Sequence, residues 1–298
     1  MDYHLLTFVT VAEKKNFTRA AEALHISQSA VTLSIKVLEK QYELKLLDRN
    51  NKYVRLTKAG EILYQNAKQI LSLYDRMNRL IEDLSHSASG VITIGSSYTF
   101  GEYLLPKIIA EFTGDFPLIK PNISIRNSHR IIAKLLRGEI DLAIVEWIAE
   151  NPKLHIHPFA QDEMVLIVSP KHPLASKQEV EIHDLREETW IIRELGSGTR
   201  QAINQLFSEN NFLPNEIRSF GSSQIIKESV EAGLGISILS LHTIRKELEL
   251  KTLHTLRIKN NPIVRNFSYV IPKMDIQPKS VSLFLSFLEN YSTLDIFA

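Results

Sequence analysis

The sequence contains no cysteine in its 298 residues, and this absence excludes several kinds of chemistry. Without thiols the chain forms no disulfides, has no cysteine nucleophile or thiol redox sensor, and offers no Cys-based zinc site. No stretch approaches the ~18 consecutive apolar residues of a membrane-spanning helix. The opening residues, MDYHLLTFVTVAEKK, carry an acid at position 2 and only a short apolar run, unlike a signal peptide. We therefore expect a soluble cytoplasmic protein that does not enter a membrane.

Patterns typical of catalytic or metal sites are also lacking. No GxSxG elbow organises the serines, histidines and acids into a triad. His155 and His157 alternate along an expected strand and so share a face, but no carboxylate or third histidine stands at ligand spacing. The sequence therefore predicts no enzyme, no metal site and no cofactor.

Length and charge point to two different parts of the chain. A chain of 298 residues suggests about two domains, and a hydrophobic content of 44% can supply their cores. The net charge is only +1, but residues 1–58 contain ten Lys and Arg against six Asp and Glu. This basic segment has a net charge of +4, which leaves −3 for the remaining residues. Any contact with nucleic acid is expected at the N-terminal end.

Three short helices are predicted in the first 42 residues. Apolar residues recur at helical spacing from Asp2 to about Lys15. Thr18 is expected to cap a second helix, and Ser27 or Ser29 a third. The residues expected to face inward from these two helices are Ala20, Ala21, Leu24, Val31, Ile35, Leu38 and Tyr42. Periodicity alone leaves two readings open: a helical hairpin in an ordinary core, or a helix-turn-helix that enters a DNA groove.

The next stretch, LKLLDRNNKYVRLT, predicts a short hairpin that turns at Asn50 and Asn51. A hairpin beside a three-helix unit commonly contacts the phosphate backbone of DNA. Arg49, Lys52 and Arg55 would supply the positive charge. The hairpin and the charge distribution together favour DNA binding.

Residues 59–86 contain no proline and, after Gly60, no glycine. Apolar side chains recur there at alternating spacings of four and three: Leu63, Ala67, Ile70, Tyr74, Met77, Ile81 and Leu84. Such a seam over three heptads is typical of a coiled coil. A helix of this length reaches about 39 Å, so a partner chain is its expected cover. The alternative is an amphipathic helix packed on its own domain.

After Gly90 the pattern changes to alternating strands and helices. VITIG, ISIRNS and DLAIV are expected strands, separated by a helix that starts at Pro106 and by RIIAKLLRGEI. A second series follows, with strands MVLIVSP, WIIREL, IRSFG and GISILS and helices near residues 200–210 and 223–232. FSYVIP and a helix over residues 280–291 come last. This order predicts two α/β units with a cleft between them.

The chain at this point resembles the LysR-type transcriptional regulators. The resemblance is densest in FTRAAEALHISQSAVTLSIKVLE and RLTKAG, and continues through ITIG, LLP, GEIDLAI, SPKHPLA and VEAGLGISILS. One departure is Leu47, where the family usually has phenylalanine. The resemblance implies a winged helix-turn-helix in residues 1–58, a dimerising linker helix in residues 59–88, and an effector domain in residues 89–298.

The effector domain implied by the resemblance is an α/β fold of two subdomains, like a periplasmic binding protein. Two crossovers, near Gln161-Asp162 and near Asn266, would divide it into residues 91–161 with 267–298, and residues 162–266. The resemblance also implies a homotetramer built as a dimer of dimers. Contact with RNA polymerase is expected of such a regulator.

The DNA-binding residues follow from their places on these elements. Gln28, Ser29 and Thr32 stand at the start of the third helix, where short polar side chains reach base edges. Lys36, one turn further on, is expected to contact phosphate. The remaining expected phosphate contacts are Thr18, Arg49, Lys52 and Arg55.

Two loops, GSSYTF and ELGSGTRQAINQLF, each lead from a strand into a helix and are rich in hydroxyls. Free backbone N–H groups and the positive end of a helix dipole favour an anionic ligand, although plain helix caps are the alternative. By resemblance, Ser97, Thr99, Glu146 and Thr199 match positions that hold the effector, and Ser197 lies in the same loop as Thr199. Glu146 disfavours a plain dianion unless a cation offsets it, and would select an amine or hydroxyl instead.

The sequence thus predicts a DNA-binding regulator controlled by a small molecule in the cleft. The alternative is a binding-protein-like enzyme or solute receptor that uses the same cleft, because one fold serves many functions. The basic N-terminal segment favours the regulator.

Overall fold

The computed structural model describes residues 2–49, 53–84, 89–147, 150–274 and 276–292. Its contacts divide the chain into two compact units. The first contains residues 1–86 with Arg137–Glu139, and the second contains residues 87–136 and 140–298. Among the described residues, no helix is long and apolar enough to cross a membrane.

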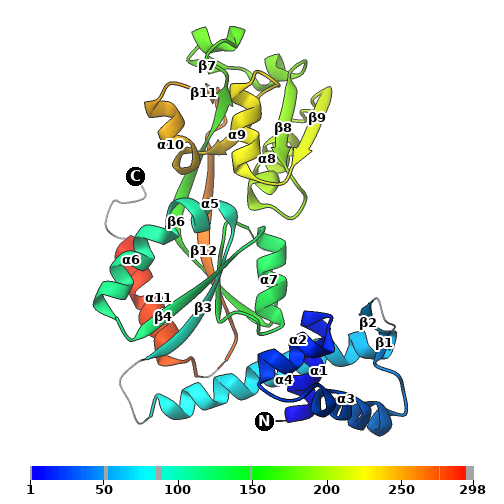
Figure 1. Cartoon of the computed structure of the whole chain (residues 1–298). Helices are drawn as coiled ribbons and strands as arrows, with labels where there is room; N and C mark the ends of the chain where they lie inside the picture. The colour runs from blue at the N-terminus through cyan, green and yellow to red at the C-terminus, as the bar shows by residue number, and fades with distance from the viewer. Residues whose placement is uncertain (1, 50–52, 85–88, 148–149, 275, 293–298) are drawn as a thin grey trace. The chain divides into compact units, whose positions relative to one another are not determined.

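Three helices open the first unit: α1 (Tyr3–Lys14), α2 (Phe17–Leu24) and α3 (Gln28–Tyr42) (Figure 1). Ser27 caps α3, as predicted, by accepting a hydrogen bond from the Ala30 N–H at 3.1 Å. The prediction that Thr18 caps α2 is wrong. Asn16 is the cap, because its backbone is extended and its side chain accepts a hydrogen bond from the Arg19 N–H. Thr18 lies in the first turn instead.

The core of this unit forms where the three helices meet. Its fully buried side chains include Phe8, Val11, Ala20, Val31 and Ile35. The prediction that Tyr42 is buried is wrong: it is the last residue of α3 and 44% exposed. Leu24 is only half-buried.

Glu39, near the end of α3, is buried although it was not among the residues predicted to face inward. Its carboxylate accepts hydrogen bonds from the Leu46 and Leu47 N–H groups, at 3.0 and 3.4 Å, and from Lys45 Nζ at 3.1 Å. Burial opposes ionisation, but these donors prevail and lower the pKa of Glu39 below its ordinary value. Glu39 therefore fixes the end of α3 to the hairpin that follows.

The hairpin consists of β1 (Leu47–Arg49) and β2 (Val54–Leu56), paired antiparallel with Leu47 opposite Leu56. The predicted turn at Asn50 and Asn51, and Lys52 beside it, lie outside the described residues. Leu47, the departure from the family pattern, is buried in the core, so one apolar side chain replaces another there.

The long helix α4 (Lys58–Glu82) begins directly after the hairpin. Thr57 caps it by accepting a hydrogen bond from the Gly60 N–H at 3.0 Å, and its hydroxyl donates to the Lys45 carbonyl at 2.6 Å. A side chain at Gly60 would overlap the Leu46 carbonyl oxygen. The helix ends at Glu82, earlier than the predicted His86, which lies outside the described residues.

The apolar seam of α4 has two parts. Ala67 is fully buried and Leu63 half-buried against the three helices. Beyond them Ile70, Met77 and Ile81 are 52%, 44% and 58% exposed. An exposed apolar stripe of this length is typical of an interaction surface.

The second unit begins with the predicted βαβαβ alternation, which is confirmed. Strands β3 (Gly90–Ser96), β4 (Ile119–Ile125) and β5 (Leu142–Val145) are parallel, with β3 in the middle. Helices α6 (Leu105–Asp115) and α7 (Ser128–Leu136) connect them, and Pro106 lies in the first turn of α6. A short helix that was not predicted, α5 (Tyr98–Tyr103), precedes α6.

Two long strands, β6 (Leu154–Val168) and β12 (Ile263–Pro272), run through both lobes of this unit (Figure 1). They pair antiparallel, and Asn266 lies opposite Gln161. The main sheet has the order β4-β3-β5-β12-β6-β11-β7, and β10 pairs with β6 beside it. Helix α11 (Lys279–Ser292) follows β12.

The second lobe contains the remaining elements. Its helices are α8 (Gly198–Glu209), α9 (Ser223–Glu231) and α10 (Leu241–Glu249), with short 3-10 turns at Pro173–Ser176 and Ile182–Leu185. Its strands are β7 (Glu179–Val180), β8 (Thr189–Arg193), β9 (Glu216–Phe220), β10 (Ser237–Ser240) and β11 (His254–Ile258).

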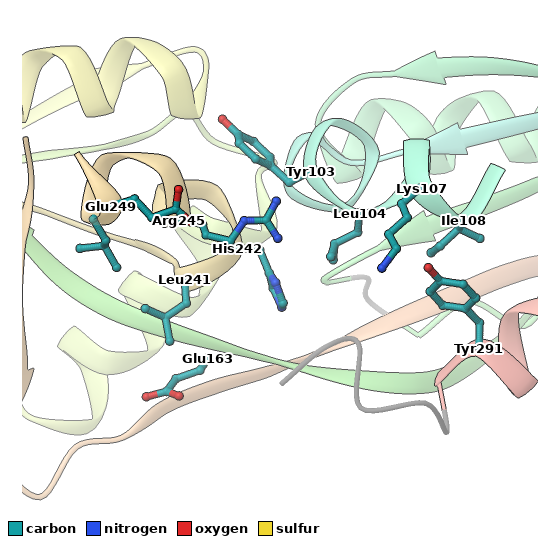
Figure 2. A pocket seen from close by; sticks show the side chains of 11 residues that line it. Tyr103, Leu104, Lys107, Ile108, Glu163, Leu241, His242, Arg245, Glu249 and Tyr291 are labelled. Atoms are coloured by element: carbon teal, nitrogen blue, oxygen red, sulfur yellow. The ribbon is translucent and has the colours of Figure 1, made fainter. Parts of the chain in front are cut away.

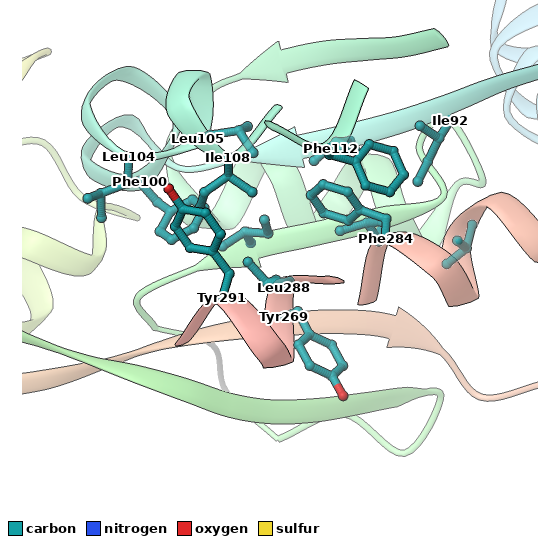
Figure 3. Close-up of a cluster of buried hydrophobic side chains, with 14 of the residues drawn as sticks. Ile92, Phe100, Leu104, Leu105, Ile108, Phe112, Tyr269, Phe284, Leu288 and Tyr291 are labelled. Atoms are coloured by element: carbon teal, nitrogen blue, oxygen red, sulfur yellow. The ribbon is translucent and has the colours of Figure 1, made fainter. Parts of the chain in front are cut away.

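Each lobe has its own apolar core. In the first, Phe112 meets Phe284 edge-to-face with ring centroids 5.1 Å apart, beside Ile108 and Leu288 (Figure 3). In the second, Trp190 packs edge-to-face on Phe207 at 4.8 Å. Because β6 and β12 carry the chain from one lobe to the other, polar groups near this strand pair can respond to both lobes.

Candidate functional sites

The exposed face of α3 presents the residues predicted to read DNA. Gln28, Ser29, Thr32 and Lys36 line a shallow hollow of about 620 Å³ together with Leu33. The Ser27 and Ser29 hydroxyl oxygens are 2.8 Å apart, and the Thr32 hydroxyl donates to the Gln28 carbonyl at 2.9 Å. These short side chains are thus held close to their own helix, while Gln28 and Lys36 are exposed.

The predicted phosphate contacts surround this helix within the first unit. Thr18 is exposed on α2, and Arg55 is exposed on β2, where its guanidinium lies 4.7 Å from the centre of the Tyr53 ring. Arg49 belongs to β1, but its side chain lies outside the described part of the chain, as does Lys52.

In the second unit, the predicted effector residues gather around an arginine that the sequence analysis did not single out. Arg265, on β12, is 9% exposed. Its Nη2 donates to the Thr99 hydroxyl at 3.2 Å and its Nη1 donates to the Thr199 hydroxyl at 3.1 Å. Thr99 belongs to the first lobe and Thr199 to the second, so one guanidinium bonds to both lobes.

Two carboxylates complete this cluster. Asp162, fully buried on β6, accepts a hydrogen bond from Arg265 Nε at 2.7 Å and another from the Ser240 hydroxyl at 2.6 Å. Glu146, at the end of β5, lies 3.8 Å from Arg265 Nη2 and accepts a hydrogen bond from Ser128 at 3.2 Å. The positive charge of Arg265 therefore offsets the negative charge of Glu146, but it also offsets that of Asp162.

The two hydroxyl-rich loops face this cluster with incompletely bonded serines. Ser97 and Ser197 precede α5 and α8, yet neither side chain forms a capping hydrogen bond. The Ser97 hydroxyl is buried and has no hydrogen-bond partner among the described residues. A buried hydroxyl without a partner costs about 1–3 kcal/mol, so Ser97 is suited to receive a ligand group.

Gly198 allows the two lobes to approach at this point. A Cβ at Gly198 would lie 2.9 Å from both Cβ and Oε2 of Glu146, closer than side chains tolerate. The N-terminus of α8 therefore reaches the Glu146 carboxylate because position 198 has no side chain. The positive end of the helix dipole is directed to the same place.

A second buried cation, Arg193, belongs to β8 of the second lobe and is 1% exposed. It is paired with Glu194 at 2.7 Å and lies 4.8 Å from the centre of the Tyr98 ring. Burial opposes the ionisation of Glu194, but Arg193 and Asn127 lower its pKa. Burial raises the pKa of Glu102 despite the nearby charges of Arg193 and Lys227. Arg193 is thus a buried cation, whereas Glu194 is half-buried and Glu102 is exposed.

His155 and His157 do share a face of β6, with ring centroids 6.0 Å apart. Across the residues that the structure describes, however, no three His, Cys, Asp or Glu side chains form a group that could hold a metal ion.

The chain matches two family models along its length. Residues 3–61 match the bacterial regulatory helix-turn-helix protein of the lysR family, and residues 85–292 match the LysR substrate binding domain. The chain belongs to the LysR family of transcriptional regulators. The predicted fold class, a winged helix-turn-helix and linker helix followed by a two-lobed α/β effector domain, is confirmed.

Individual relatives agree with this membership. The chain is 37% identical over 290 residues to the HTH-type transcriptional regulator CysL of Bacillus subtilis (strain 168), covering 97% of both chains. The regulatory domain of CcmR from Synechocystis PCC6803, solved in complex with 2-PG, is 30% identical with a TM-score of 0.63, covering 69% of this chain and 99% of that domain. Full-length CbnR, solved in complex with its target DNA, has the same fold, with a TM-score of 0.73 at 22% identity and coverage of 97% and 98%.

Proposed function

We propose that this LysR-type regulator binds promoter DNA through the exposed face of α3 and is controlled by a small effector in the cleft around Arg265. The DNA-binding head would comprise residues 1–58, the linker residues 59–88 and the effector domain residues 89–298. Within the last, residues 91–161 with 267–298 and residues 162–266 would be the two subdomains.

The observation that carries the effector proposal is the bridge made by Arg265 between Thr99 and Thr199. An effector that hydrogen-bonds the same hydroxyls would compete with this guanidinium or join it, and so change how the lobes meet. A ligand shifts such an equilibrium only by its difference in affinity for the two arrangements. The resulting change in the lobes would be transmitted to the DNA-binding heads and to bending of the promoter.

The chemistry of the cluster supports, as our proposal, a small anionic effector with a further polar group. The free donors are the Ser97 hydroxyl and the N-terminus of α8 at Ser197 and Thr199, which favour an acidic group. Glu146 would accept a hydrogen bond from a hydroxyl or amine of the same ligand. The complex of CcmR with 2-PG supports a small effector in this domain.

On the DNA side, Gln28, Ser29 and Thr32 would contact base edges, because they are at the exposed start of α3. The other residues would position the head on phosphates without reading sequence: Thr18, Lys36, Arg49, Lys52 and Arg55. This assignment is supported by the exposure of Gln28, Lys36 and Arg55, which all belong to the first unit.

The exposed part of the α4 seam supports a dimer formed through the linker helix, and we propose a tetramer built as a dimer of dimers. A regulator of this kind would work in the cytoplasm and contact RNA polymerase at the promoter. We infer that it is not an enzyme, because its relatives are named as regulators.

The test uses Thr99→Ala and Thr199→Ala in the full-length protein, with Ser208→Ala, exposed on the same helix as Thr199, as a control. A thermal-shift screen of small metabolites would first supply a ligand. Each threonine variant should then bind it more weakly by about 1–3 kcal/mol, measured by calorimetry, and should keep ligand-free operator binding in gel shifts.

Unchanged ligand affinity in both threonine variants would mean that these loops are plain helix caps. Loss of operator binding without ligand would instead assign them a structural role. The rival function, an enzyme or solute receptor using the cleft, would be favoured if the full-length protein bound the ligand but no DNA.

A further inference from the structure

The carboxylate of Glu194 forms a second polar connection between the lobes of the second unit. Arg193, beside it on β8, donates from Nε and Nη2 to the two carboxylate oxygens at 2.7 and 2.9 Å. Asn127, which directly precedes α7 in the first lobe, donates from its side-chain amide to Glu194 Oε1 at 3.0 Å. One carboxylate thus accepts hydrogen bonds from both lobes.

The donors around this carboxylate form a built anion site. Arg193 is 1% exposed, and Asn127 is 9% exposed. Contacts other than the one with Glu194 also position the guanidinium: its Nη1 donates to the Ser223 hydroxyl at 3.4 Å, and the Tyr98 ring lies 4.8 Å away. A guanidinium that binds both oxygens of a carboxylate is a strong and specific arrangement for acidic groups. The same donors would therefore suit the acidic group of a ligand.

The carboxylate that fills this site belongs to an exposed loop, residues 194–197. The Glu194 side chain is 28% exposed, and Leu195, which follows it, is 75% exposed. Gly196 has a φ of +87°, a conformation that favours glycine, and its carbonyl accepts a hydrogen bond from the His129 N–H of α7 at 3.1 Å. The loop is therefore attached to the first lobe at two points, Glu194 and Gly196.

This connection joins the same two loops that supply the polar cluster around Arg265. Tyr98, whose ring lies against Arg193, stands between Ser97 and Thr99. The loop of residues 194–197 leads directly into α8. A change at Arg193 is thus able to reach the cluster through both loops.

Helix α5 rests on two buried cations of the second lobe. Tyr98, at its start, lies over Arg193, and Tyr103, at its end, has its ring centre 5.2 Å from Lys227 Nζ. Figure 2 shows the Tyr103 ring directed from α5 toward the second lobe. Lys227 has its own carboxylate partner within the second lobe, Glu247 at 2.6 Å. The carboxylate partner of Arg193 differs because it is also bonded to the first lobe.

We propose that Arg193 and Asn127 form an acid-binding subsite that Glu194 occupies as a built-in ligand, and that the acidic group of an effector replaces Glu194 there. This inference rests on the proposed function, which supplies an acidic effector. A free acid satisfies the same donors but is not attached to the loop of residues 194–197. Replacement therefore removes the link between this loop and α7, and the acid favours the lobe arrangement in which the link is absent.

Rescue by a small acid tests the subsite in the full-length protein. Glu194→Ala removes the side chain beyond Cβ, and acetate has the same carbon and oxygen atoms as the part removed. Without added acid the melting temperature should fall by about 5 °C, because Arg193 loses its charged acceptor. Acetate should recover most of this fall. Acetamide, which has a similar shape but no charge, should recover little of it.

Glu216→Ala is the matched control, because it also takes a carboxylate from an arginine, Arg218, but in an exposed pair. Acetate should change the melting temperature of this variant no more than chloride does at equal ionic strength. Equal effects of acetate on Glu194→Ala and Glu216→Ala would refute the subsite. Refolding of Glu194→Ala in acetate and in acetamide covers the case of a variant that is unstable alone, and equal yields would also refute it.

Hydrogen exchange tests the link between the loop and α7. The His129 N–H is bonded to the Gly196 carbonyl, whereas the Ile131 N–H is bonded to the Asn127 carbonyl of its own lobe. In Glu194→Ala the His129 amide should exchange at least about tenfold faster and the Ile131 amide at the wild-type rate. Acetate should leave the exchange of His129 fast, because it fills the subsite without holding the loop. Restored protection of His129 by acetate would refute the release of the loop.

These measurements need neither DNA nor an identified effector, so their failure is distinct from a failure of the proposed function. Gel shifts with promoter DNA supply the comparison. Acetate rescue of Glu194→Ala in a protein that binds no promoter DNA would support the subsite and contradict the regulatory function. Promoter binding by a protein whose Glu194→Ala variant shows no rescue would refute the subsite and leave the regulatory function standing.

Discussion

The surface of α3 proposed to bind DNA and the polar cluster around Arg265 both contain short polar side chains, but these are held in opposite ways. On α3 the hydroxyls of Ser29 and Thr32 bond within four residues along the chain and remain near solvent. In the cleft, the hydroxyls of Thr99 and Thr199 are 2% exposed and bond to a guanidinium 166 and 66 residues away.

This difference suggests how recognition and control are separated in one chain. A surface whose polar groups are bonded locally keeps its shape when the rest of the protein moves, so it is suited to reading a fixed partner. A buried cluster bonded across two lobes changes when the lobes change, so it is suited to sensing. Substitutions on the two surfaces should therefore have different effects on stability and on binding.

The largest expected effect is on the oligomeric state, because the proposed pairing of α4 would join two α3 surfaces. Replacing Ile70 and Met77 together with lysine should abolish the proposed dimer, because charges at an a/d seam have no partner. Both side chains are exposed in the single chain, so the fold should survive. Sedimentation measures the change, with Gln65→Lys/Gln69→Lys as a control of equal added charge off the seam. A double variant that stays oligomeric would mean that the pairing surface lies elsewhere.

The next largest effect should be seen in the cleft. Arg265→Ala leaves Asp162 buried without its cation and should reduce the free energy of unfolding by about 3–5 kcal/mol. Urea unfolding measures the loss, and Arg55→Ala, an exposed cation beside the DNA surface, should change the stability by less than about 0.5 kcal/mol. Adding Asp162→Asn to Arg265→Ala should recover part of the loss. Equal free energies of unfolding for Arg265→Ala and Arg55→Ala would contradict the view that the buried cluster, unlike the α3 surface, stabilises the fold.

A smaller effect is expected at Glu39, a buried carboxylate of α3. Glu39→Gln should reduce the free energy of unfolding by about 2 kcal/mol, since it weakens hydrogen bonds to a charged group. The folded-state pKa of Glu39 is below its ordinary value of 4.5. Its stabilisation is therefore present above about pH 4.5 and is lost as the pH falls through the folded-state value.

Unfolding experiments between about pH 7 and pH 3 should show this dependence in the wild-type protein and less of it in Glu39→Gln. Glu43→Gln, an exposed carboxylate four residues later, provides the control. The role assigned to Glu39 would be wrong if both variants followed the wild-type pH profile.

The smallest effect is expected for substitutions on the proposed DNA-binding surface, which should leave the fold unchanged and alter only DNA recognition. Gln28→Ala should reduce discrimination between operator and random DNA by about 1–3 kcal/mol, as expected for the loss of a base contact. Arg55→Ala should weaken binding to both DNAs similarly and reduce the salt dependence by about one counterion. Equal losses on both DNAs for Gln28→Ala would remove Gln28 from base readout.

Local periodicity predicted the helices of the first unit to within a few residues, because each helix is specified by side chains a few positions apart. Its errors were at helix ends. Asn16 rather than Thr18 caps α2, Tyr42 is exposed at the last position of α3, and α4 ends at Glu82. Ends depend on capping geometry, for which several nearby residues are chemically suitable.

In the second unit the strands and long helices were predictable, but the centre of the cleft was not. Arg265 comes from a strand 66 residues beyond Thr199, and no local pattern relates them. A signal was nevertheless present: Arg265 and Asp162 are charged residues in otherwise strand-forming segments, PIVRNFSYVIP and AQDEMVLIV. Helix α5 was missed because six residues are too few to establish a helical period.

The junction at Thr57 and Gly60 has a mechanical consequence. Thr57 bonds both to the hairpin strand and to the first turn of α4, and Gly60 lies against the Leu46 carbonyl. The hairpin and the first turn of α4 should therefore move together as one rigid body. Helix α4 has 25 residues and is about 37 Å long. A tilt of about 10° at the far end of that helix displaces the head by about 6 Å, comparable to the rise of nearly two base pairs along a duplex.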